Sequence, residues 1–326
     1  MPPPVNILIV KLSSLGDVVH TFPAVQDVLA SVPDARIDWV VEKGFAPLVE
    51  RCAGIHKVVP CELRKWSRSP LSAATRHEWR EFRRGLRSVR YDAIVDLHGL
   101  TKSALIARAA RTAEAGKRYA LGNQTDGAGW EAPTRWVADV AVEIEPRTDA
   151  VGRSRLLCAK AFGYAVPPHL RFGLEANPHD PSPGRPCIAF VHGTSREDKQ
   201  WPRPDWIALG RDLAGQGFSI GLPHGSDAER QRSQEFADAI GGHAHVWPRL
   251  DLATLTDWLA GCAGVIGVDS GLSHIAVALD LPHVQVYNFD TAWRTGPAGG
   301  RQRSVFASPA PTLQAVREAW LAVAPR

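Results

Sequence analysis

Short apolar runs rich in β-branched residues alternate with helical patterns along most of the chain. This alternation is typical of βαβ units that build a parallel sheet, so an α/β fold is expected. In the first half, strands are expected at residues 6–11, 36–42 and 91–97, and helices at 18–30 and 103–111. In the second half, strands are expected at 187–192, 218–222, 264–268 and 283–287, and helices at 204–214, 228–240, 252–260, 272–279 and 312–323.

A proline-dense segment, residues 164–187, separates these two halves. It has little apolar periodicity, so it reads as an interdomain linker with one short strand at most. The length of 326 residues also favours two domains. We therefore expect two Rossmann-like domains, 1–168 and 169–326, with a cleft between them. Ligands of open parallel sheets bind beyond the carboxyl ends of the strands, so the loops leaving those ends should carry the chemistry.

The composition excludes several classes of protein. The hydrophobic share of 44% and charged share of 22% are those of a globular protein with a core. No run approaches the roughly 18 apolar residues of a membrane span, and residues 1–4 do not resemble the start of a signal peptide. The five scattered cysteines argue against a disulfide framework or zinc knuckle and for a reducing cytoplasm. A net charge of +4 is too mild to imply nucleic-acid binding.

The loop after the first expected strand contains Ser14, Gly16 and Asp17. A dinucleotide-binding fingerprint would need more glycines than Gly16 alone, so that class is excluded here. Asp17 stands at the start of a helix, where an aspartate commonly acts as the N-cap. A carboxylate at the mouth of a cleft could also remove a proton from an acceptor hydroxyl. Both interpretations remain open at this point.

The loop after the strand at 187–192 carries Thr194, Ser195 and Lys199. Small hydroxyl residues after a buried strand allow an anion to approach closely, and backbone N–H groups there can bind phosphate oxygens. Lys199 supplies a mobile positive charge of the kind that stabilises a departing diphosphate. The simpler interpretation is a polar surface loop that leads into the next helix.

The segment Asp269-Ser270-Gly271-Leu272-Ser273-His274 follows the strand at 264–268. Gly271 permits a close backbone approach to a ligand, and the N–H groups of residues 270–272 open a helix N-terminus, which favours phosphate binding. Asp269 is too negative to face a bare diphosphate, so it is expected to bind sugar hydroxyls or to orient Lys199. The alternative is a helix cap with a satisfied His274.

Arginines dominate residues 64–90, and only Glu78 and Glu81 offset them. Trp79, Phe82, Leu86 and Val89 recur at helical spacing, which predicts an amphipathic helix with its arginines outward. Such a charge run is usually a solvated face, but the imbalance of sign favours an anionic partner, either a phosphorylated acceptor or an acidic membrane surface. Nucleic acid is disfavoured because the aromatic residues lie on the buried face.

Several motifs occur together in one order: IVKLSSLGDVVHTFPA near the start, DWVVEKGFA, LHGLTKSA, REDKQWP and VDSGLSH. This set resembles glycosyltransferase family nine, the heptosyltransferases of lipopolysaccharide core assembly, and is most similar to the heptosyltransferase I type. The resemblance implies a GT-B fold. It also implies inverting transfer of heptose from ADP-L-glycero-D-manno-heptose to the Kdo residue of Kdo-lipid A. The implied enzyme needs no cofactor or metal and works at the cytoplasmic face of the inner membrane, bound peripherally.

The resemblance also implies roles for individual residues. Asp17 would be the general base, and Lys199 would share in catalysis. The implied donor-binding residues are Thr194, Ser195, Lys199, Glu229, Leu250, Asp269, Ser270, Gly271, Leu272 and His274. The implied acceptor-binding residues are Ser14, Gly16, Arg64, Lys65, Arg68 and Lys102.

The chain departs from the family pattern at two places expected to border the cleft. Residues 288–291 read Asn-Phe-Asp-Thr instead of a Gly-Pro-Thr turn, and residues 149–153 read Asp-Ala-Val-Gly-Arg instead of His-Ala-Val-Glu-Arg. Both affect the expected specificity. The alternatives are heptosyltransferase II or another core transferase, a GT-B-like sugar-nucleotide epimerase or phosphorylase, and a nucleotide-binding module without activity. An epimerase would need a proton-shuttling pair, whereas the resemblance supplies one base.

Overall fold

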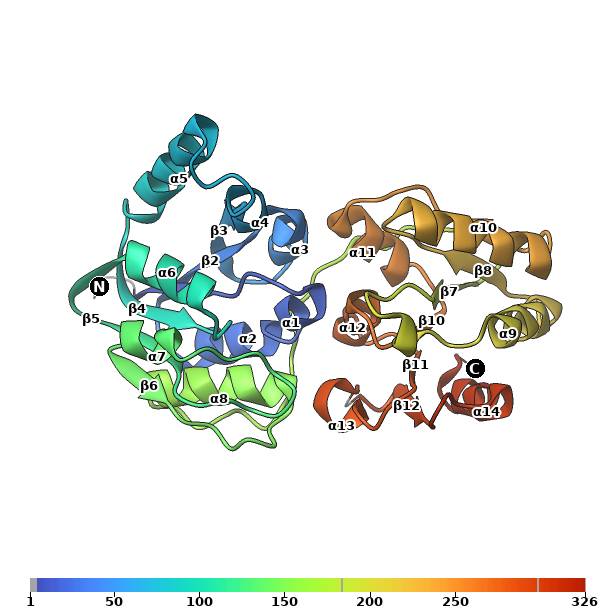
Figure 1. The fold of residues 1–326 in the computed structure, drawn as a ribbon. Coiled ribbons are helices and arrows are strands. Elements are labelled where there is room, and N and C mark those ends of the chain that lie inside the picture. Colours follow the sequence, from blue (N-terminus) through green and yellow to red (C-terminus); the bar gives the residue numbers. More distant parts are fainter. Residues whose placement is uncertain (1–4, 183, 298, 326) are drawn as a thin grey trace. The chain divides into compact units, whose positions relative to one another are not determined.

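The chain divides into two compact units, Met1–Gly173 and Leu174–Arg326, each with a six-stranded sheet of its own (Figure 1). The structure, a computed structural model, describes residues 5–182, 184–297 and 299–325. The domain boundary expected at 168/169 lies a few residues before the division seen here. Residues 1–4, where no signal peptide is expected, and Pro183 of the proline-dense segment lie outside the described residues.

The first unit has a parallel sheet in the order β3-β2-β1-β4-β5-β6. Its strands are β1 Val5–Val10, β2 Ala35–Glu42, β3 Ile55–Cys61, β4 Arg90–Asp96, β5 Arg111–Leu121 and β6 Val140–Val142. Its helices are α1 Leu15–Val19, α2 Phe22–Ser31, the 3-10 turn η1 Lys43–Phe45, α3 Ala46–Val49, α4 Leu63–Trp66, α5 Ala73–Leu86, α6 Thr101–Ala109, α7 Pro133–Val137 and α8 Ala150–Phe162.

The second unit has a parallel sheet in the order β12-β11-β10-β7-β8-β9. Its strands are β7 Cys187–Val191, β8 Ser219–Leu222, β9 Ala244–Val246, β10 Gly264–Val268, β11 His283–Tyr287 and β12 Gln302–Phe306. Its helices are the 3-10 turn η2 Glu197–Lys199, α9 Arg203–Gly215, α10 Asp227–Ile240, α11 Leu252–Ala260, α12 Gly271–Ala278, α13 Ala292–Thr295 and α14 Leu313–Val323.

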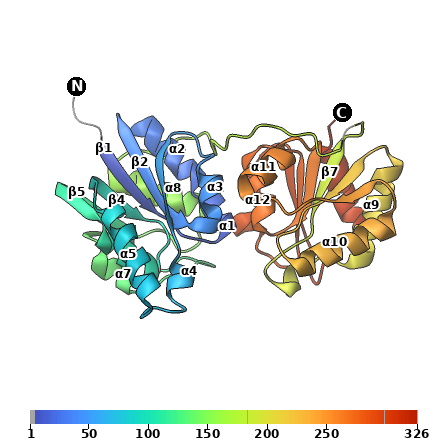
Figure 2. The same cartoon turned by 90° about the horizontal axis from the view of Figure 1, so that it is seen from above.

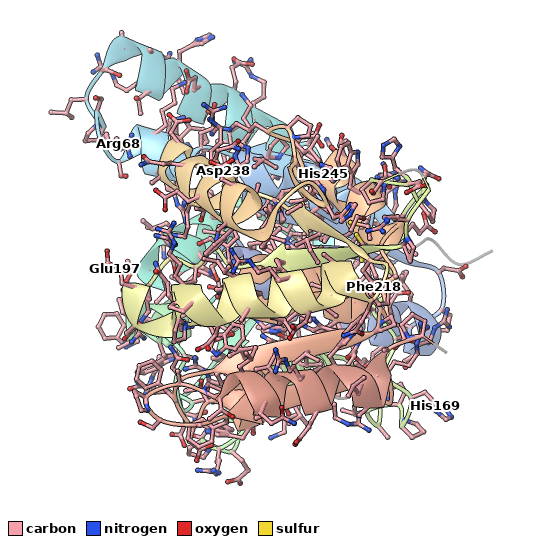
Figure 3. All side chains as sticks on the ribbon, turned by 90° about the vertical axis from the view of Figure 1, so that its right-hand side faces the viewer. Arg68, His169, Glu197, Phe218, Asp238 and His245 are labelled. Carbon is pink, nitrogen blue, oxygen red and sulfur yellow. The ribbon has the colours of Figure 1, made fainter. Side chains whose placement is uncertain are left out.

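Both sheets have the same topology. If the strands of each unit are counted from one to six, both sheets read 3-2-1-4-5-6, the doubly wound order of Rossmann-like domains. Helices cover both faces of each sheet (Figures 1 and 2). Figure 3 shows one such layer, in which α9 lies between α10 and α14, with Glu197 near its first turn and Phe218 just beyond its last. The central strands are therefore apolar on both sides, which explains the continuous runs in the sequence.

The predicted central strands of both sheets are confirmed, whereas most strands nearer the sheet edges were not predicted. Strands β3, β5, β6, β9 and β12 were not expected; β5, for example, carries four charged residues in the sequence RTAEAGKRYAL. Strands toward the edge of a sheet face solvent on part of their surface, so their sequences lack a continuous apolar run. The helix expected at 18–30 is wrong as a single element, because α1 and α2 are separate. Helix α5 ends at Leu86, so Val89 lies beyond it.

The proline-dense segment is extended. Between α8 and β7, the described residues contain no helix or strand beyond an isolated bridge at Leu174. All five cysteines are buried thiols, as expected for core positions. In the described part of the chain, no helix combines the length and apolarity needed to cross a bilayer.

Candidate functional site

Asp17 lies in the first turn of α1, directly after the loop that leaves β1. The expected N-cap is wrong in detail: Ser14 occupies the N-cap position, and Asp17 is the third helical residue of a capping box. The Oδ2 atom of Asp17 accepts hydrogen bonds from the Ser14 backbone N–H at 3.2 Å and from the Ser14 hydroxyl at 2.8 Å. Gly16, half-buried, precedes it within the helix. The capping interaction uses one carboxylate oxygen and leaves Oδ1 for other contacts.

Lys11 lies beneath this carboxylate. Its Nζ is 3.8 Å from Oδ1 of Asp17 and donates a hydrogen bond to the carbonyl of Leu97 at 2.9 Å. The Lys11 side chain is only 5% exposed, whereas that of Asp17 is 38% exposed. The cation is thus held inside the unit while the carboxylate is open to solvent, so a ligand can reach Asp17 without displacing Lys11.

The pKa of the Asp17 carboxyl is held well below its ordinary value. Partial burial acts in the opposite direction, but the charges of Lys11 and His20 and the hydrogen bonds from Ser14 outweigh it. Asp17 is therefore fully ionised at neutral pH. It can accept a hydrogen bond from a hydroxyl group, and it is a weak base that holds a proton only briefly.

The loop after β4 brings a second carboxylate, that of the buried Asp96, close to Lys11, and the sequence did not predict this. The carboxylate of Asp96 accepts hydrogen bonds from the backbone of His98 at 2.9 Å and Gly99 at 3.2 Å, and from the Ser103 hydroxyl at 2.8 Å. Burial raises the pKa of Asp96 to about 6, against these bonds and the charge of Lys11. The two loops are neighbours because β4 pairs with β1, with Asp96 opposite Val10, and this pairing of distant segments is not visible in the sequence.

The four basic residues predicted to bind the acceptor do not form one cluster. Arg64 and Lys102 line the same cavity, whereas Arg68 is exposed and does not line it. Lys65 forms ion pairs with Glu78 at 2.7 Å and with Glu62 at 3.8 Å, so its charge is partly neutralised within α4 and α5. Glu78 was expected to offset the basic charge of residues 64–90, but Glu62 lies before that segment and was not considered.

In the second unit, Lys199 and Asp269 form an ion pair with a distance of 2.6 Å between Nζ and Oδ2. Nε2 of His274 is 3.5 Å from the other carboxylate oxygen. Burial opposes ionisation of Asp269, but His274 and Lys199 outweigh it and hold its pKa well below the ordinary range. Of the two roles expected for Asp269, orienting Lys199 agrees with this ion pair, which restrains a lysine that the sequence suggested to be mobile.

Helix α12 begins beside this ion pair. Ser270 is its N-cap residue, but its hydroxyl makes no hydrogen bond to the first turn. The Ser270 Oγ atom is buried and has no hydrogen-bond partner among the described residues. The first N–H groups of any helix lack intrahelical acceptors, and in α12 these free donors are the N–H groups of Gly271 and Leu272. A buried hydroxyl, helix N–H groups and the positive end of the helix dipole together suit an anion.

The remaining predicted donor residues lie at the same edge of the sheet. The loops after β9, β8, β7 and β10 leave four adjacent parallel strands at their carboxyl ends. Thr194 is half-buried and Ser195 exposed after β7, and Leu250 is half-buried before α11. Glu229 closes the capping box of α10, where its Oε2 accepts the Gly225 N–H at 2.7 Å. The topology thus brings all the predicted donor-binding residues to one edge of unit 2.

Asn288, the first residue of the departing turn at 288–291, contacts the Lys199 loop. Its side-chain N–H₂ donates to the carbonyls of Asp198 and Gln200, both at 2.9 Å, and Asn288 is only 6% exposed. Asn288 therefore fixes the backbone on both sides of Lys199. In the other departing segment, Asp149 is the N-cap of α8 and accepts the Gly152 N–H at 2.8 Å.

No group of three or more His, Cys, Asp or Glu side chains in residues 5–182, 184–297 and 299–325 is arranged to hold a metal ion.

Two doubly wound units, the second with a Lys–Asp pair beside a helix N-terminus that suits an anion, are the architecture of the GT-B class of glycosyltransferases. Comparison with known proteins narrows this class. The family model of glycosyltransferase family 9 (heptosyltransferase) matches residues 79–319, and the chain belongs to this family.

Individual relatives agree with this assignment. The chain is 36% identical over 299 residues to lipopolysaccharide heptosyltransferase 1 of Pseudomonas aeruginosa, covering 91% of this chain and 82% of that protein. It is similar to the structure of the E. coli heptosyltransferase WaaC with ADP, with a TM-score of 0.86 and 32% identity over 96% of this chain and 98% of that one. WaaC with ADP-2-deoxy-2-fluoro heptose matches with a TM-score of 0.82 and 31% identity over the same shares.

Proposed function

We propose that this enzyme transfers heptose from ADP-heptose to the Kdo residue of Kdo-lipid A, with inversion at the anomeric carbon and without a metal. The observation that carries the proposal is the Lys199–Asp269 pair next to the unpartnered Ser270 hydroxyl at the start of α12. The similarity to WaaC, which has been solved with ADP and with an ADP-heptose analogue, supports the same donor.

In unit 2, the diphosphate of the donor would bind at the N-terminus of α12. The N–H groups of Gly271 and Leu272, the Ser270 hydroxyl and Lys199 would face the charge that develops as the bond between the anomeric carbon and the diphosphate oxygen breaks. Asp269 would hold Lys199 in place and accept hydrogen bonds from the heptose hydroxyls. Thr194 and Ser195 would contact the diphosphate and heptose, Glu229 the ribose, and Leu250 the adenine.

In unit 1, the Oδ1 atom of Asp17 would accept the proton of the attacking Kdo hydroxyl as the new glycosidic bond forms. A hydroxyl becomes strongly acidic only late in its attack, so a base of low pKa takes the proton at that stage. An inverting transfer needs one such base on the face opposite the leaving group. The solvent-exposed position of Asp17 allows the proton to leave afterwards.

The acceptor carries negative charge on its phosphates and Kdo carboxylates, which suits Arg64, Lys65, Arg68 and Lys102. Ser14 and Gly16 would contact the Kdo residue beside Asp17. The arginine-rich outer face of α5 supports peripheral binding to the cytoplasmic face of the inner membrane. Co-sedimentation with anionic vesicles, absent with neutral vesicles and lost at high salt, is the expected result.

The experiment that tests this function is incubation of the purified enzyme with ADP-heptose and Kdo-lipid A, followed by mass analysis. A mass increase of one heptose on the acceptor is expected, and an added chelator should leave the rate unchanged. Transfer only to an acceptor that already carries heptose would assign the enzyme to the heptosyltransferase II type. Transfer to neither acceptor, with a change in the sugar of the donor itself, would favour an epimerase.

A further inference from the structure

The first unit contains an open cavity of about 560 Å³ lined mainly by residues of α4, α5 and α6. Figure 1 shows these three helices in this unit. Most of its wall is apolar. The apolar lining consists of Leu63, Trp66, Pro70, Trp79, Leu105 and Ile106. The rings of Trp66 and Trp79 pack edge to face in this wall, with centroids 5.7 Å apart.

Cations surround this apolar space. Arg64, Arg76 and Lys102 line the cavity, and none of the three forms an ion pair within the part of the chain that the structure describes. Glu42 is the carboxylate in the lining, and it accepts the backbone N–H of Arg64 at 3.2 Å. Burial raises the pKa of Glu42, against that bond and the charges of Arg64 and Lys102. The cavity thus combines an apolar wall with a net positive charge.

The cavity lies at the same edge of the sheet as Asp17. Glu42 ends β2, and its backbone N–H donates to the carbonyl of Leu12 at 3.1 Å, in the loop that leads to Asp17. Lys102 lies in the first turn of α6, which follows the Asp96 loop. A molecule whose hydroxyl reaches Asp17 can therefore extend into the cavity without leaving unit 1.

We propose that this cavity holds an acyl chain of the acceptor, with the anionic groups of the same molecule bound by Arg64, Arg76 and Lys102. The inference rests on the proposed function, because it takes the acceptor to be an anionic glycolipid. A sugar ring in the cavity would leave most of its hydroxyls facing apolar side chains, which is unfavourable. A free phosphate would gain nothing from the apolar wall. An anion with a hydrocarbon chain uses both features.

Binding of hexyl, octyl and decyl phosphate, measured by calorimetry below their micelle concentrations, tests directly whether the cavity holds a hydrocarbon chain. Affinity is expected to rise roughly three- to fourfold per added methylene. Leu105→Trp should abolish this dependence, because Leu105 is 58% exposed at the mouth of the cavity and a larger side chain there would block it. Leu321→Trp is the matched control, since Leu321 is 70% exposed on α14 in the other unit. Equal affinity for the three phosphates would overturn the proposal.

Transfer kinetics then distinguish binding of the acyl chain in the cavity from binding of the glycan. Leu105→Trp is expected to raise KM at least about tenfold for acylated Kdo-lipid A and to leave KM for the deacylated acceptor unchanged, because the lost energy is that of the buried chain. An equal rise for both acceptors would mean that the cavity holds the glycan, and the proposal would be wrong. Failure of the wild-type enzyme to heptosylate either acceptor would refute the proposed function, while the alkyl phosphate series would still decide what the cavity binds.

Discussion

At the scale of single residues, the two carboxylate oxygens of Asp17 have different neighbours, so one can cap the helix while the other is available for the proposed reaction. Oδ2 takes both hydrogen bonds from Ser14, and Oδ1 lies 3.8 Å from Nζ of the buried Lys11. The sequence identified Asp17 and left both capping and catalysis open for it. It did not identify the Asp96 loop beneath it, because that contact depends on the pairing of β1 with β4, which lie far apart in the sequence.

Replacing Asp17 by Asn should lower kcat by about 10²–10⁴-fold, because the amide cannot accept the acceptor proton. Binding of ADP should be unchanged, since the donor residues belong to unit 2. The control is Asp34→Asn: Asp34 is exposed at φ 55°, a conformation that asparagine tolerates, and should retain full activity. Full activity of the Asp17 variant in a purified assay would exclude Asp17 as the base.

His192 makes the second unit sensitive to acid. It is 2% exposed, and burial, then the charges of Arg232 and His224, lower its pKa to about 3. The unfolded chain takes up this proton near pH 6.5, so between about pH 6.5 and 3 the unfolded state binds more protons. Stability therefore falls as the pH falls through this window, by up to about 1.4 kcal/mol per pH unit from this group.

His192→Gln should flatten this dependence while its amide keeps a hydrogen bond to Ser233, now 2.8 Å from the ring. Urea unfolding at a series of pH values between neutral and about 4 measures the effect. His77→Gln, at an exposed position on α5, should give the wild-type slope. Parallel curves for the wild type and His192→Gln would show that His192 does not carry the acid sensitivity.

At the scale of elements, the predictable part of the fold was its centre. Strands β10 and β11 and helix α11 have the boundaries expected from the sequence, because they are apolar on the faces that the fold buries. The unexpected elements depend on their neighbours: β12, for example, has the partly exposed sequence QRSVF and is a strand because β11 pairs with it. Helix α8 begins at the side-chain cap of Asp149, a local signal that could have predicted it.

The packing of α14 on the second sheet requires a glycine at the start of β10. A Cβ atom on Gly264 would lie 2.5 Å from Cη2 of Trp320 and 2.8 Å from the carbonyl oxygen of Pro282. Gly264→Ala is expected to lower the free energy of unfolding by about 1–3 kcal/mol, because the tryptophan or the backbone must shift. Gly242→Ala should have a much smaller effect, since nothing lies within 4 Å of its added methyl group. Chemical unfolding of both variants measures the difference, and equal midpoints would contradict the packing argument.

At the scale of the whole molecule, the two units share one strand order but differ in their chemistry. The donor-binding residues expected from the sequence all belong to unit 2, and the acceptor-binding residues all belong to unit 1. Their grouping at sheet edges could be predicted from the sequence, because parallel strands place their carboxyl ends together. The hydrogen bonds from Asn288 to the Lys199 loop could not, because they join a side chain to backbone carbonyls nearly ninety residues away.

Binding of ADP should therefore protect unit 2 selectively. At a concentration of 100 times Kd, ADP should stabilise the unit that binds it by about 2.7 kcal/mol. Hydrogen exchange should slow in the loops at 193–200 and 269–274, and adenosine, which lacks phosphates, should give much weaker protection. Protection confined to unit 1 would contradict the assignment of donor binding.

Each sheet is built from one uninterrupted stretch of chain, since β1 to β6 all precede Gly173 and β7 to β12 all follow it. The strands described in the first unit pair only with one another, so their pairing does not require any strand of the second unit. During synthesis, the first sheet can be completed and its core closed while the second half is still being made, so exposed strand edges need not persist until the chain is released. A translation pause near the proline-dense segment should therefore be harmless, whereas a pause between β4 and β5 would leave the first sheet open on the ribosome.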